Sequence, residues 1–456
     1  MEIGIGIWAF VIYLVAIIIW MIPLKRNIAE SMGVGFLLVA LFNGGGITGY
    51  IETVSTSLLS ASKESSFLAT MLFLMMAVIM AKSGVISKLI ELLNSLIGRI
   101  KGGAAYVSTT ASFMFGIVSG NAIANGSTVG AITVPWMKES GWPNNIAATI
   151  NAGNAGVGQS MPSCSALYIL LGLAEVASEM TTGEAYIAVL SGGALTFIYR
   201  IIRVWLYTKK YDVQAVPADQ IKPLGESFKD NWTSLLMLVG IAVPLLITMG
   251  PFSTFLTNAV SFGKDAVKSI NIVLWVPIIV SIICFIVGRK NMPKTGKEWV
   301  SVIRSCQSSF ATVGGVLLFA LAASNVLTMV GFDQSLKSIL EALNLPGFIM
   351  ILLTCILVVL VAGPLSAVAT TAAVGQVAYA SFVGAGVHPI NAIVAFMICI
   401  STEGASPPSS SPIFISAGLA GVKDPKVMFK PLITDYVIPL IGVATLVAMR
   451  WLPVIK

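Results

Sequence analysis

The sequence predicts an all-α polytopic membrane protein built as an inverted repeat, with two re-entrant hairpins, two broken transmembrane helices and about 10 spans besides the hairpins. Hydrophobic residues make up 56% of the 456 residues and charged residues only 10%, whereas roughly a quarter of an average soluble domain is charged. In each half, a polar passage rich in glycine or proline interrupts an apolar run, at residues 153–165 and 401–411. Hydrocarbon tolerates such a break only where protein buries it or where it lines a cavity.

Residues 1–64 are predicted to form N-terminal scaffold spans. The span at about 3–23 has neither a basic stretch before it nor a small-residue cleavage site, so we interpret it as retained. Lys25 and Arg26 follow it and place that loop in the cytoplasm, which puts the N-terminus outside. A second span at about 33–50 leads to an amphipathic stretch, 51–62, that is expected outside.

Residues 65–207 are predicted to form the first repeat. Its centre, about 103–137, carries no charged residue and is too long for one simple span. Lys101 and Lys138 flank this centre, so both of its ends should be cytoplasmic, and a re-entrant hairpin with a polar tip at 119–128 satisfies that requirement. The other expected elements are a span at about 67–81, an amphipathic helix at 86–100 lying flat at the inner surface, a broken helix at about 145–173 and a span at about 186–207.

The second half repeats this plan after a polar cytoplasmic linker at 208–232. Residues 233–300 are predicted to form further scaffold spans, and residues 301–456 the second repeat. The expected elements are spans at about 233–250, 272–287 and 308–330, an amphipathic stretch at 334–343, a re-entrant hairpin at about 348–383, a broken helix at about 390–419 and a last span at about 438–452.

The two copies are expected to have opposite orientations in the membrane. Counting lysines and arginines in the loops places the start of the second copy on the other side from the first, and it leaves the C-terminus outside. The matching positions are Pro143 and Pro389, Pro162 and Pro408, and Gly172 and Gly418. Breaks at corresponding places in two inverted halves indicate the binding site of a transporter.

The composition disfavours several other classes of protein. His388 is the only histidine, and the five cysteines show no C-x-x-C spacing, which argues against a disulfide framework and a Cys/His metal site. Basic residues gather at the ends of spans, where they set topology, and they do not indicate a nucleic-acid partner. No serine–histidine, paired-carboxylate or zinc pattern supports an intramembrane enzyme. Re-entrant loops also occur in channels, but two inverted broken spans favour alternating access, so no enzymatic activity and no cofactor are expected.

Two stretches resemble signatures of a known transporter family. Residues 116–138, with Ser119-Gly120-Asn121-Ala122-Ile123-Ala124-Asn125 followed by a Pro-Trp-Met-Lys run, resemble the large membrane subunit (the DctM-like permease) of tripartite ATP-independent periplasmic (TRAP) transporters. Residues 406–422 are similar to the family's T-P-P…A-S-G-I-A-G-V pattern. The likeness runs from about residue 65 to the C-terminus, without the linker. Asn121 replaces the usual serine, Asn125 stands where many members carry aspartate, and residues 363–366 lack the acidic residue that the family often has there.

The resemblance implies a multi-pass secondary carrier of the ion-transporter superfamily in the bacterial cytoplasmic (inner) membrane. Such carriers import small organic anions, typically carboxylates, driven by sodium, and they move by an elevator motion. Most members work with a four-span small membrane subunit and a soluble substrate-binding protein. Membrane lipid is the other expected partner. The alternative is a stand-alone proton- or sodium-coupled carboxylate symporter that needs no binding protein. The identity of the anion stays open.

We predict two cation cages, because unwound carbonyls and Ser, Thr or Asn side chains bind sodium with little fixed charge. The first hairpin tip faces the first break, and the second tip faces the second break. The predicted sodium ligands are Ser119, Asn121, Asn125, Gly156, Gly158, Gly363, Ser366, Thr370, Thr402, Ser406 and Pro407. The predicted substrate-binding residues are Asn151, Asn154, Gln159, Ser160, Ser163, Glu403 and Ser409.

Glu403 is the sharpest single candidate, because an ionisable group at membrane depth is costly and indicates function. It is expected to bind a cation or to carry a coupling proton. Half-helix N-termini could hold the anion without an arginine. No arginine is expected near either break, and Arg200 and Arg203 are expected to extend toward the membrane surface from an inner span end.

Overall fold

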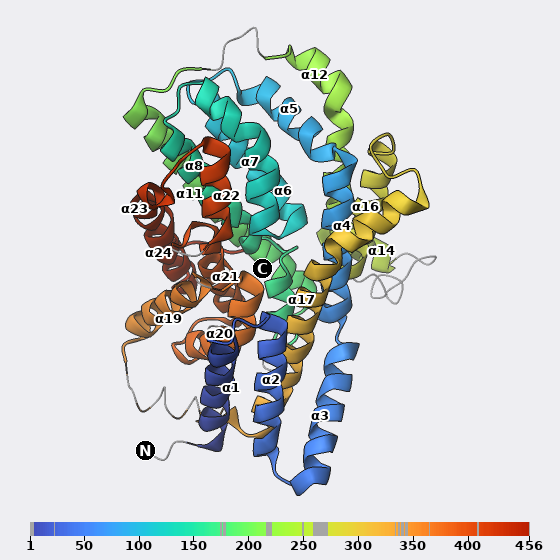
Figure 1. Cartoon of the computed structure of the whole chain (residues 1–456), viewed down its shortest axis with the longest axis vertical. Helices are drawn as coiled ribbons and strands as arrows, with labels where there is room; N and C mark the ends of the chain where they lie inside the picture. The colour runs from blue at the N-terminus through green and yellow to red at the C-terminus, as the bar shows by residue number, and fades with distance from the viewer. Residues whose placement is uncertain are drawn as a thin grey trace.

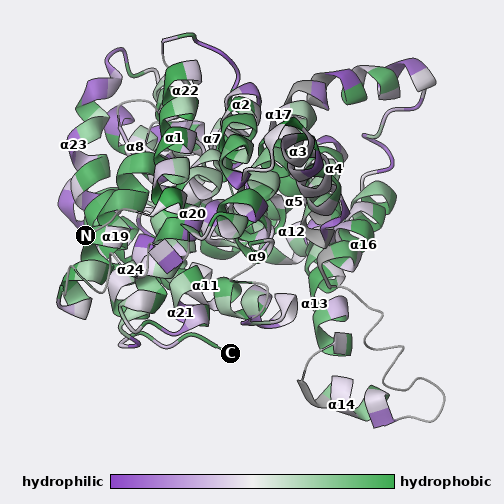
Figure 2. Ribbon diagram, turned by 90° about the horizontal axis from the view of Figure 1, so that it is seen from below, coloured by the Kyte–Doolittle hydropathy of each residue, from purple (hydrophilic) through white to green (hydrophobic). Residues whose placement is uncertain are grey.

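The computed structural model describes residues 4–21, 23–173, 176, 179–215, 221–248, 250–258, 272–332, 334–335, 338, 342, 345–363, 365–407 and 410–455. Within these ranges all regular secondary structure is helical (Figure 1). This agrees with the predicted all-α class. Apolar residues dominate the large helices, as Figure 2 shows.

Three N-terminal helices pack along one long helix of the second half. They are α1 (Ile5–Met21), α2 (Ile28–Ala40, followed by the 3₁₀ turn Leu41–Asn43) and α3 (Gly46–Lys63). Each of them contacts α17 (Gly296–Met329). The segment expected to span from about residue 308 is therefore part of a longer helix, which begins at Gly296 because Thr295 caps the amide of Glu298.

The first repeat begins with two helices that meet at a sharp bend. α4 (Ser65–Ser83) and α5 (Val85–Ile97) are inclined by 65° at Gly84, whose φ of 72° suits glycine. α5 buries Leu89 and Ile90, while the charged residues Lys88 and Glu91 on its other side are partly exposed. It is the amphipathic helix that the sequence predicted at 86–100.

Each predicted hairpin consists of two antiparallel helices with a polar turn. The first pair is α6 (Gly103–Ser119) and α7 (Ala122–Glu139), and the second is α19 (Gly347–Ala362) and α20 (Ala367–Gly384). Asn121 and Ser366 precede the second helix of each pair, and each caps it by accepting a hydrogen bond from a backbone amide.

Each predicted broken helix is interrupted by a 3₁₀ turn and a short non-helical stretch. The first consists of α8 (Asn144–Ala155), the turn Gly156–Ser160 and α9 (Ser165–Leu171). The second consists of α21 (Pro389–Ile400), the turn Glu403–Ala405 and α22 (Ser411–Ala420). Pro143 and Pro389 stand at the starts of α8 and α21, where proline suits a helix.

The remaining helices connect and surround these elements. They are α11 (Thr182–Tyr211), α12 (Leu224–Asn231), α13 (Leu236–Thr248), α14 (Gly250–Asn258), α16 (Ile272–Val287), the short α23 (Phe429–Leu432) and α24 (Ile438–Ala448). The linker between the halves is held against α5, because Lys222 forms an ion pair with Glu91 at 2.5 Å. Most of the amphipathic stretch expected at 334–343 lies outside the described residues.

Fewer helices than the expected number of spans are long enough to cross a membrane by themselves. Among the described residues, five helices are long and apolar enough, or six if α4 and α5 count as one bent span. α1, α2, α16, α19, α21 and α22 are apolar but shorter. The count of about 10 spans, which includes tilted and interrupted helices, stays a prediction.

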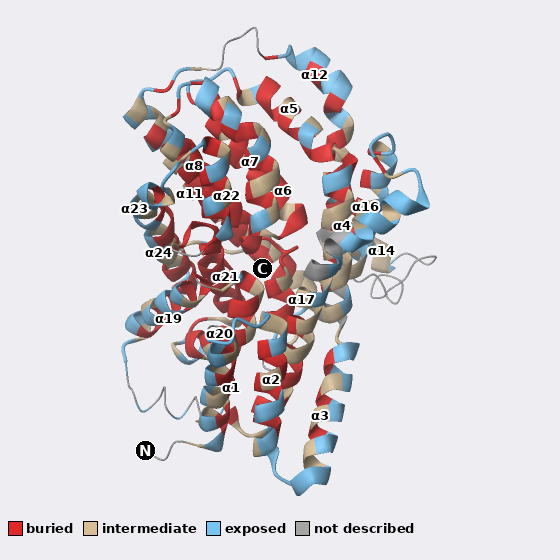
Figure 3. Ribbon diagram, in the orientation of Figure 1, coloured by how far each residue is buried: buried red, intermediate tan, exposed pale blue. Residues whose placement is uncertain are grey.

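The second part of each broken helix packs against the other repeat. α22 contacts α7 and α8, while α9 contacts α20 and α21. Figure 3 shows buried residues concentrated where these helices meet, and the largest apolar cluster joins both halves through residues such as Leu167, Leu170, Phe396 and Ile413. The two halves therefore share one core, which holds the two breaks together.

Candidate functional site

The two breaks cross with their backbones in contact. A methyl group added to Gly156 would lie 1.9 Å from the carbonyl oxygen of Ser401, and one added to Gly404 would lie 2.7 Å from the amide nitrogen of Gly156. Only residues without a side chain permit such an approach. The sequence predicted polar breaks in corresponding places, and the structure brings them into contact at the centre of the molecule.

Glu403 connects the second hairpin to the first break. Its Oε2 accepts a hydrogen bond from the amide of Ala367 at 2.8 Å and another from Nε2 of Gln159 at 3.0 Å. Only 7% of Glu403 is exposed. Ala367 is the first residue of α20, so this carboxylate lies at the positive end of a helix dipole. The thiol of Cys164 donates a hydrogen bond to the side-chain oxygen of Gln159, with 2.8 Å between Sγ and Oε1.

The tip of the first hairpin packs directly on the first break. A methyl group added to Gly116 would lie only 3.0 Å from Cα of Gly158. The hydroxyl of Ser163 donates a hydrogen bond to the Gly116 carbonyl at 3.1 Å. Gly120, with φ of 57°, lies over the Ser163 carbonyl. The predicted pairing of this tip with this break is therefore present in the structure, and Asn121 uses its side-chain oxygen to cap α7.

Several buried oxygens near this tip have no hydrogen-bond partner. Asn125 donates its amide to the Ser112 carbonyl, and Asn154 donates to Thr109 Oγ1, both at 2.9 Å. Among the described side chains, Oδ1 of both asparagines is left without a partner, as are the hydroxyls of Ser112 and Ser119. Because buried polar groups are nearly always paired, oxygens left free on α6, α7 and α8 fit a site that binds a cation.

The tip of the second hairpin faces the second break. A methyl group on Gly363 would lie 3.7 Å from Cβ of Ser406 and 3.9 Å from the carbonyl oxygen of Pro407. The hydroxyls of Thr402 and Ser406 donate to backbone carbonyls of their own turn, so their lone pairs are open to a cation. The predicted ligand Thr370 is buried, and its hydroxyl has no partner among the described residues.

Three residues of the predicted site, Asn151, Ser160 and Ser366, have other partners in the structure. Asn151 donates to the Gly126 carbonyl at 2.9 Å and to Ser416 Oγ at 2.8 Å, and so connects α7 to α22. The hydroxyl of Ser160 lies 3.1 Å from that of Thr196 on α11, away from the first tip. Ser409 lies outside the described residues. The Ser366 hydroxyl caps α20.

The expectation that no arginine lies near either break is wrong. Arg200 of α11 is only 1% exposed, and its Nε donates to the carbonyl of Gly153, the first residue of the first break, at 3.1 Å. Its Nη1 donates to the Thr196 carbonyl at 3.2 Å. The side chain does not extend to the surface because α11 turns this face, from Gly193 through Thr196 and Arg200 to Tyr207, into the core.

Arg203, one turn further along α11, is half-buried and is held by an ion pair. It forms an ion pair with Asp435, which lies in a π-helical turn, Ile433–Val437, before α24. Tyr207 donates to the same carboxylate at 2.6 Å, and Tyr199 donates to the Asp435 carbonyl at 2.6 Å. The spacing of Arg200 from Gly193 and Thr196 on one helix face was the signal in the sequence that could have placed it in the core.

Comparison with known proteins identifies the family. Residues 7–455 match the sequence profile described as the tripartite ATP-independent periplasmic transporter, DctM component. The chain belongs to this family. The resemblance found in the two signature stretches is thereby confirmed over nearly the whole sequence.

Curated relatives of this DctM-type chain include large permeases with different substrates in their names. It is 23% identical to the C4-dicarboxylate TRAP transporter large permease protein DctM of Pseudomonas aeruginosa, over an alignment of 396 residues that covers 86% of each chain. It is 22% identical to the ectoine TRAP transporter large permease protein TeaC of Halomonas elongata, over 71% of this chain and 68% of that one.

Solved structures of two transporters share the fold. Neisseria gonorrhoeae MtrF, described as representing a class of antimetabolite efflux pumps, superposes with a TM-score of 0.66 at 14% identity, over 98% of this chain and 96% of that one. The Alcanivorax borkumensis YdaH transporter gives 0.65 at 16% identity, over 89% of each chain.

Family membership establishes the broad class of the chain. DctM components are multi-pass membrane transporter subunits rather than enzymes, and the family transports organic acids by secondary transport. TRAP large permeases work with a small membrane subunit and a substrate-binding protein.

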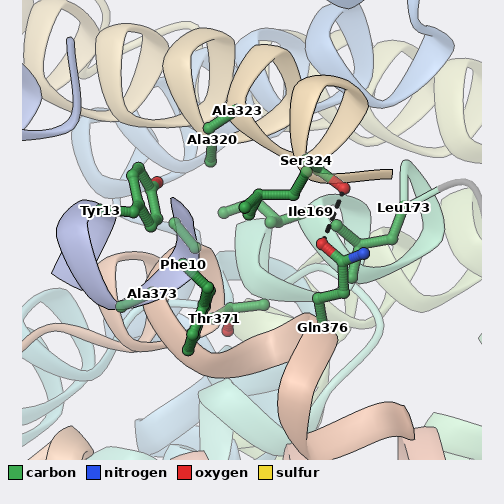
Figure 4. A pocket seen from close by; sticks show the side chains of 12 residues that line it. Phe10, Tyr13, Ile169, Leu173, Ala320, Ala323, Ser324, Thr371, Ala373 and Gln376 are labelled. Carbon is green, nitrogen blue, oxygen red and sulfur yellow. Dashed lines mark hydrogen bonds between the residues drawn. The ribbon is translucent and has the colours of Figure 1, made fainter. Parts of the chain in front are cut away.

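A small cavity of this permease lies beside the two breaks rather than at them. It has a volume of only about 10 Å³ and lies where α1 and α17 meet α9 and α20 (Figure 4). Ser324 and Gln376 supply polar atoms there and are joined by a hydrogen bond of 3.2 Å. None of the predicted site residues lines this cavity, which lies between two N-terminal-side helices, α1 and α9, and two helices of the second half, α17 and α20.

Proposed function

We propose that this chain imports a small organic anion of the carboxylate class in symport with sodium, by an elevator motion. The observation that carries the proposal is the crossing of two polar breaks, each facing one hairpin tip, with Glu403 hydrogen-bonded to both sides. Two inverted breaks at the centre of a membrane protein are the arrangement in which secondary transporters bind substrate and ions.

Sodium is proposed to bind where unpaired oxygens meet each break. At the first break these are the oxygens of Asn125, Asn154 and Ser119, together with carbonyls at Gly156 and Gly158. At the second break the Thr370 hydroxyl is unpaired among the described side chains. The hydroxyls of Thr402 and Ser406, which donate to backbone carbonyls and keep their lone pairs, and the Pro407 carbonyl are proposed to complete this site. Neutral oxygens of this kind are ligands for a hard monovalent cation, and no fixed countercharge is required.

The substrate carboxylate is proposed to use donors that a protein carboxylate occupies in this structure. The Ala367 amide and the Gln159 amide together hold Glu403, so they already form a site suited to a carboxylate at a helix N-terminus. We infer that the substrate takes these donors when Glu403 is displaced. The same exchange gives Glu403 a route to carry a proton, which is the basis of the alternative, a proton-coupled carboxylate symporter.

Sodium coupling is tested by uptake of a radiolabelled C4-dicarboxylate panel into proteoliposomes. An inward sodium gradient should drive accumulation, and Asn125→Ala and Asn154→Ala should each lower the apparent sodium affinity about tenfold, the effect of losing roughly one ligand worth 1.4 kcal/mol. Ser62→Ala, at an exposed hydroxyl of α3, is the control. Accumulation that follows an imposed proton gradient and ignores sodium would contradict this assignment.

Glu403→Gln separates the two coupling modes. Under sodium coupling, the variant should keep ion-driven uptake with an altered substrate KM, because glutamine still accepts the two hydrogen bonds through its carbonyl oxygen. Under proton coupling, accumulation should be lost while counterflow of substrate continues. The pair of assays, net uptake and counterflow in the same vesicles, distinguishes these results.

Accessory proteins and orientation are further parts of the proposal. We propose placement in the bacterial inner membrane with both termini outside, and cooperation with a four-span subunit and a soluble binding protein as in the family. Uptake by the chain alone would favour the stand-alone symporter. Uptake that begins only after both partners are added would place it among the tripartite systems.

A further inference from the structure

An apolar groove on the outside of the molecule has no role in the site described above. It lies between one face of α4, from Met75 to Lys82, and one face of α17, from Trp299 to Ala311, and Met292 closes one end. It encloses about 1240 Å³ including its open mouth. Met75 and Ile303 on its walls are 42% and 58% exposed, so none of the described residues covers them.

The length of the groove matches half a bilayer. Trp299 and Ala311 are twelve residues apart on α17, which corresponds to about 18 Å at about 1.5 Å per residue. The hydrocarbon of one leaflet is about 15 Å thick, half of the roughly 30 Å core. An acyl chain lying along the two helices would fill this length.

One end of the groove is positively charged and the rest is apolar. Among the described residues that line it, Lys82 is the only charged side chain, and Gln307 is the only side chain with an uncharged polar end group. Beyond Lys82, the turn between α16 and α17, taken together with the first residues of α17, carries four exposed basic residues: Arg289, Lys290, Lys294 and Lys297. Trp299 lies at the same end and stacks on Phe285 with ring centroids 6.2 Å apart. Tryptophan together with lysine at one end is the pattern of a membrane–water interface.

The basic turn is fixed next to Lys82 rather than free. Nδ2 of Asn291 donates to the carbonyl of Ser83, the last residue of α4, at 3.1 Å. Gly288 approaches Ser83 so closely that a methyl group there would lie 2.4 Å from its Cβ. Glu298 is the one acidic residue between residues 288 and 299, and its carboxylate accepts a hydrogen bond from the backbone amide of Lys294 at 2.8 Å. The positive charge of this end is therefore held in place and exceeds the negative charge.

We propose that this groove binds one anionic phospholipid, with its phosphate on Lys82 and the basic turn and an acyl chain along α4 and α17. Charge decides between the possible occupants, because an apolar helix of another protein would leave five cations without a counter-ion. Loops rich in lysine and arginine are cytoplasmic, so the lipid belongs to the inner leaflet, whose surface is negative. The inference does not rest on the proposed substrate or on the coupling ion.

The test is titration of the purified full chain with dioleoylphosphatidylglycerol or dioleoylphosphatidylcholine, followed by native mass spectrometry. Phosphatidylglycerol should bind more tightly, and Lys82→Gln should weaken it about fivefold, the equivalent of about 1 kcal/mol for one basic residue near an anionic surface. Lys82→Arg should restore binding. Lys101→Gln, at an exposed lysine outside the groove, should leave it unchanged.

A second variant tests the groove itself rather than the charge. Ala311→Phe places a ring into the groove from an exposed position and should lower binding of both lipids, while the unfolding midpoint without added lipid stays at the wild-type value. Equal binding of the two lipids, with Lys82→Gln indistinguishable from Lys101→Gln, would overturn the proposal in favour of ordinary surrounding lipid. Displacement of bound phosphatidylglycerol by a co-expressed four-span subunit would overturn it in favour of a subunit interface.

Discussion

Replacing Gly156 with alanine should abolish transport and destabilise the protein. The added methyl group would lie 1.9 Å from the Ser401 carbonyl oxygen, a contact that backbone on both sides makes hard to relieve. Overpacking in a core costs about 1–3 kcal/mol, and here relief requires that the two breaks move apart. The unfolding midpoint in detergent and initial uptake rates in proteoliposomes measure the two effects.

Gly418→Ala is the matched control for this change. Gly418 lies in α22, close in sequence to the second break, and a methyl group there meets no atom within 4 Å. Alanine at an exposed helical glycine should be neutral or stabilise by up to about 1 kcal/mol. Normal uptake by Gly156→Ala would show that the backbones of the two breaks do not cross at this contact.

Arg200→Met should reduce uptake by about 10- to 100-fold, because methionine of similar length removes both hydrogen bonds of the guanidinium. The Gly153 carbonyl would then lose a buried, charged hydrogen-bond donor, at a cost of about 1–3 kcal/mol, directly at the first break. Removing an unpaired buried charge offsets part of this loss in global stability. We therefore expect a large effect on transport and a smaller one on the unfolding midpoint.

Two further variants define what Arg200 contributes. Arg200→Lys keeps the charge but lacks the planar fork that reaches both the Gly153 and Thr196 carbonyls, so uptake should be intermediate. Arg304→Met, at an exposed arginine of α17, should behave as wild type. Equal uptake by Arg200→Met and Arg304→Met would exclude a role for Arg200 in holding the first break.

The boundaries of the central helices were predictable because local chemistry sets them. The hairpin predicted at about 103–137 corresponds to α6 and α7, which together run from Gly103 to Glu139. The broken helix predicted at about 145–173 corresponds to α8 and α9. Pro143 precedes the start of α8, and the glycines from 153 to 158 end it. Charge-free length, proline and glycine act within a few residues, so the sequence displays them directly.

The contacts between distant segments were not predictable from one sequence. Nothing local in Gln159 or Glu403 indicates that they bind each other, since 244 residues separate them. Asn121 and Ser366 were predicted as sodium ligands, whereas in the structure their oxygens cap helices. Helix caps and cation sites use the same residue types, so only the fold tells which partner a given oxygen has.

The position of Glu403 has a thermodynamic consequence for the whole carrier. One oxygen of its carboxylate is shared between a donor of the first repeat, Gln159, and a donor of the second, Ala367. Any ligand that changes the strength of the hydrogen bond from one donor to this oxygen also changes the strength of the hydrogen bond from the other donor. By linkage, if an ion at one break raises the affinity for an anion at the other by some factor, the anion raises the affinity for that ion by the same factor.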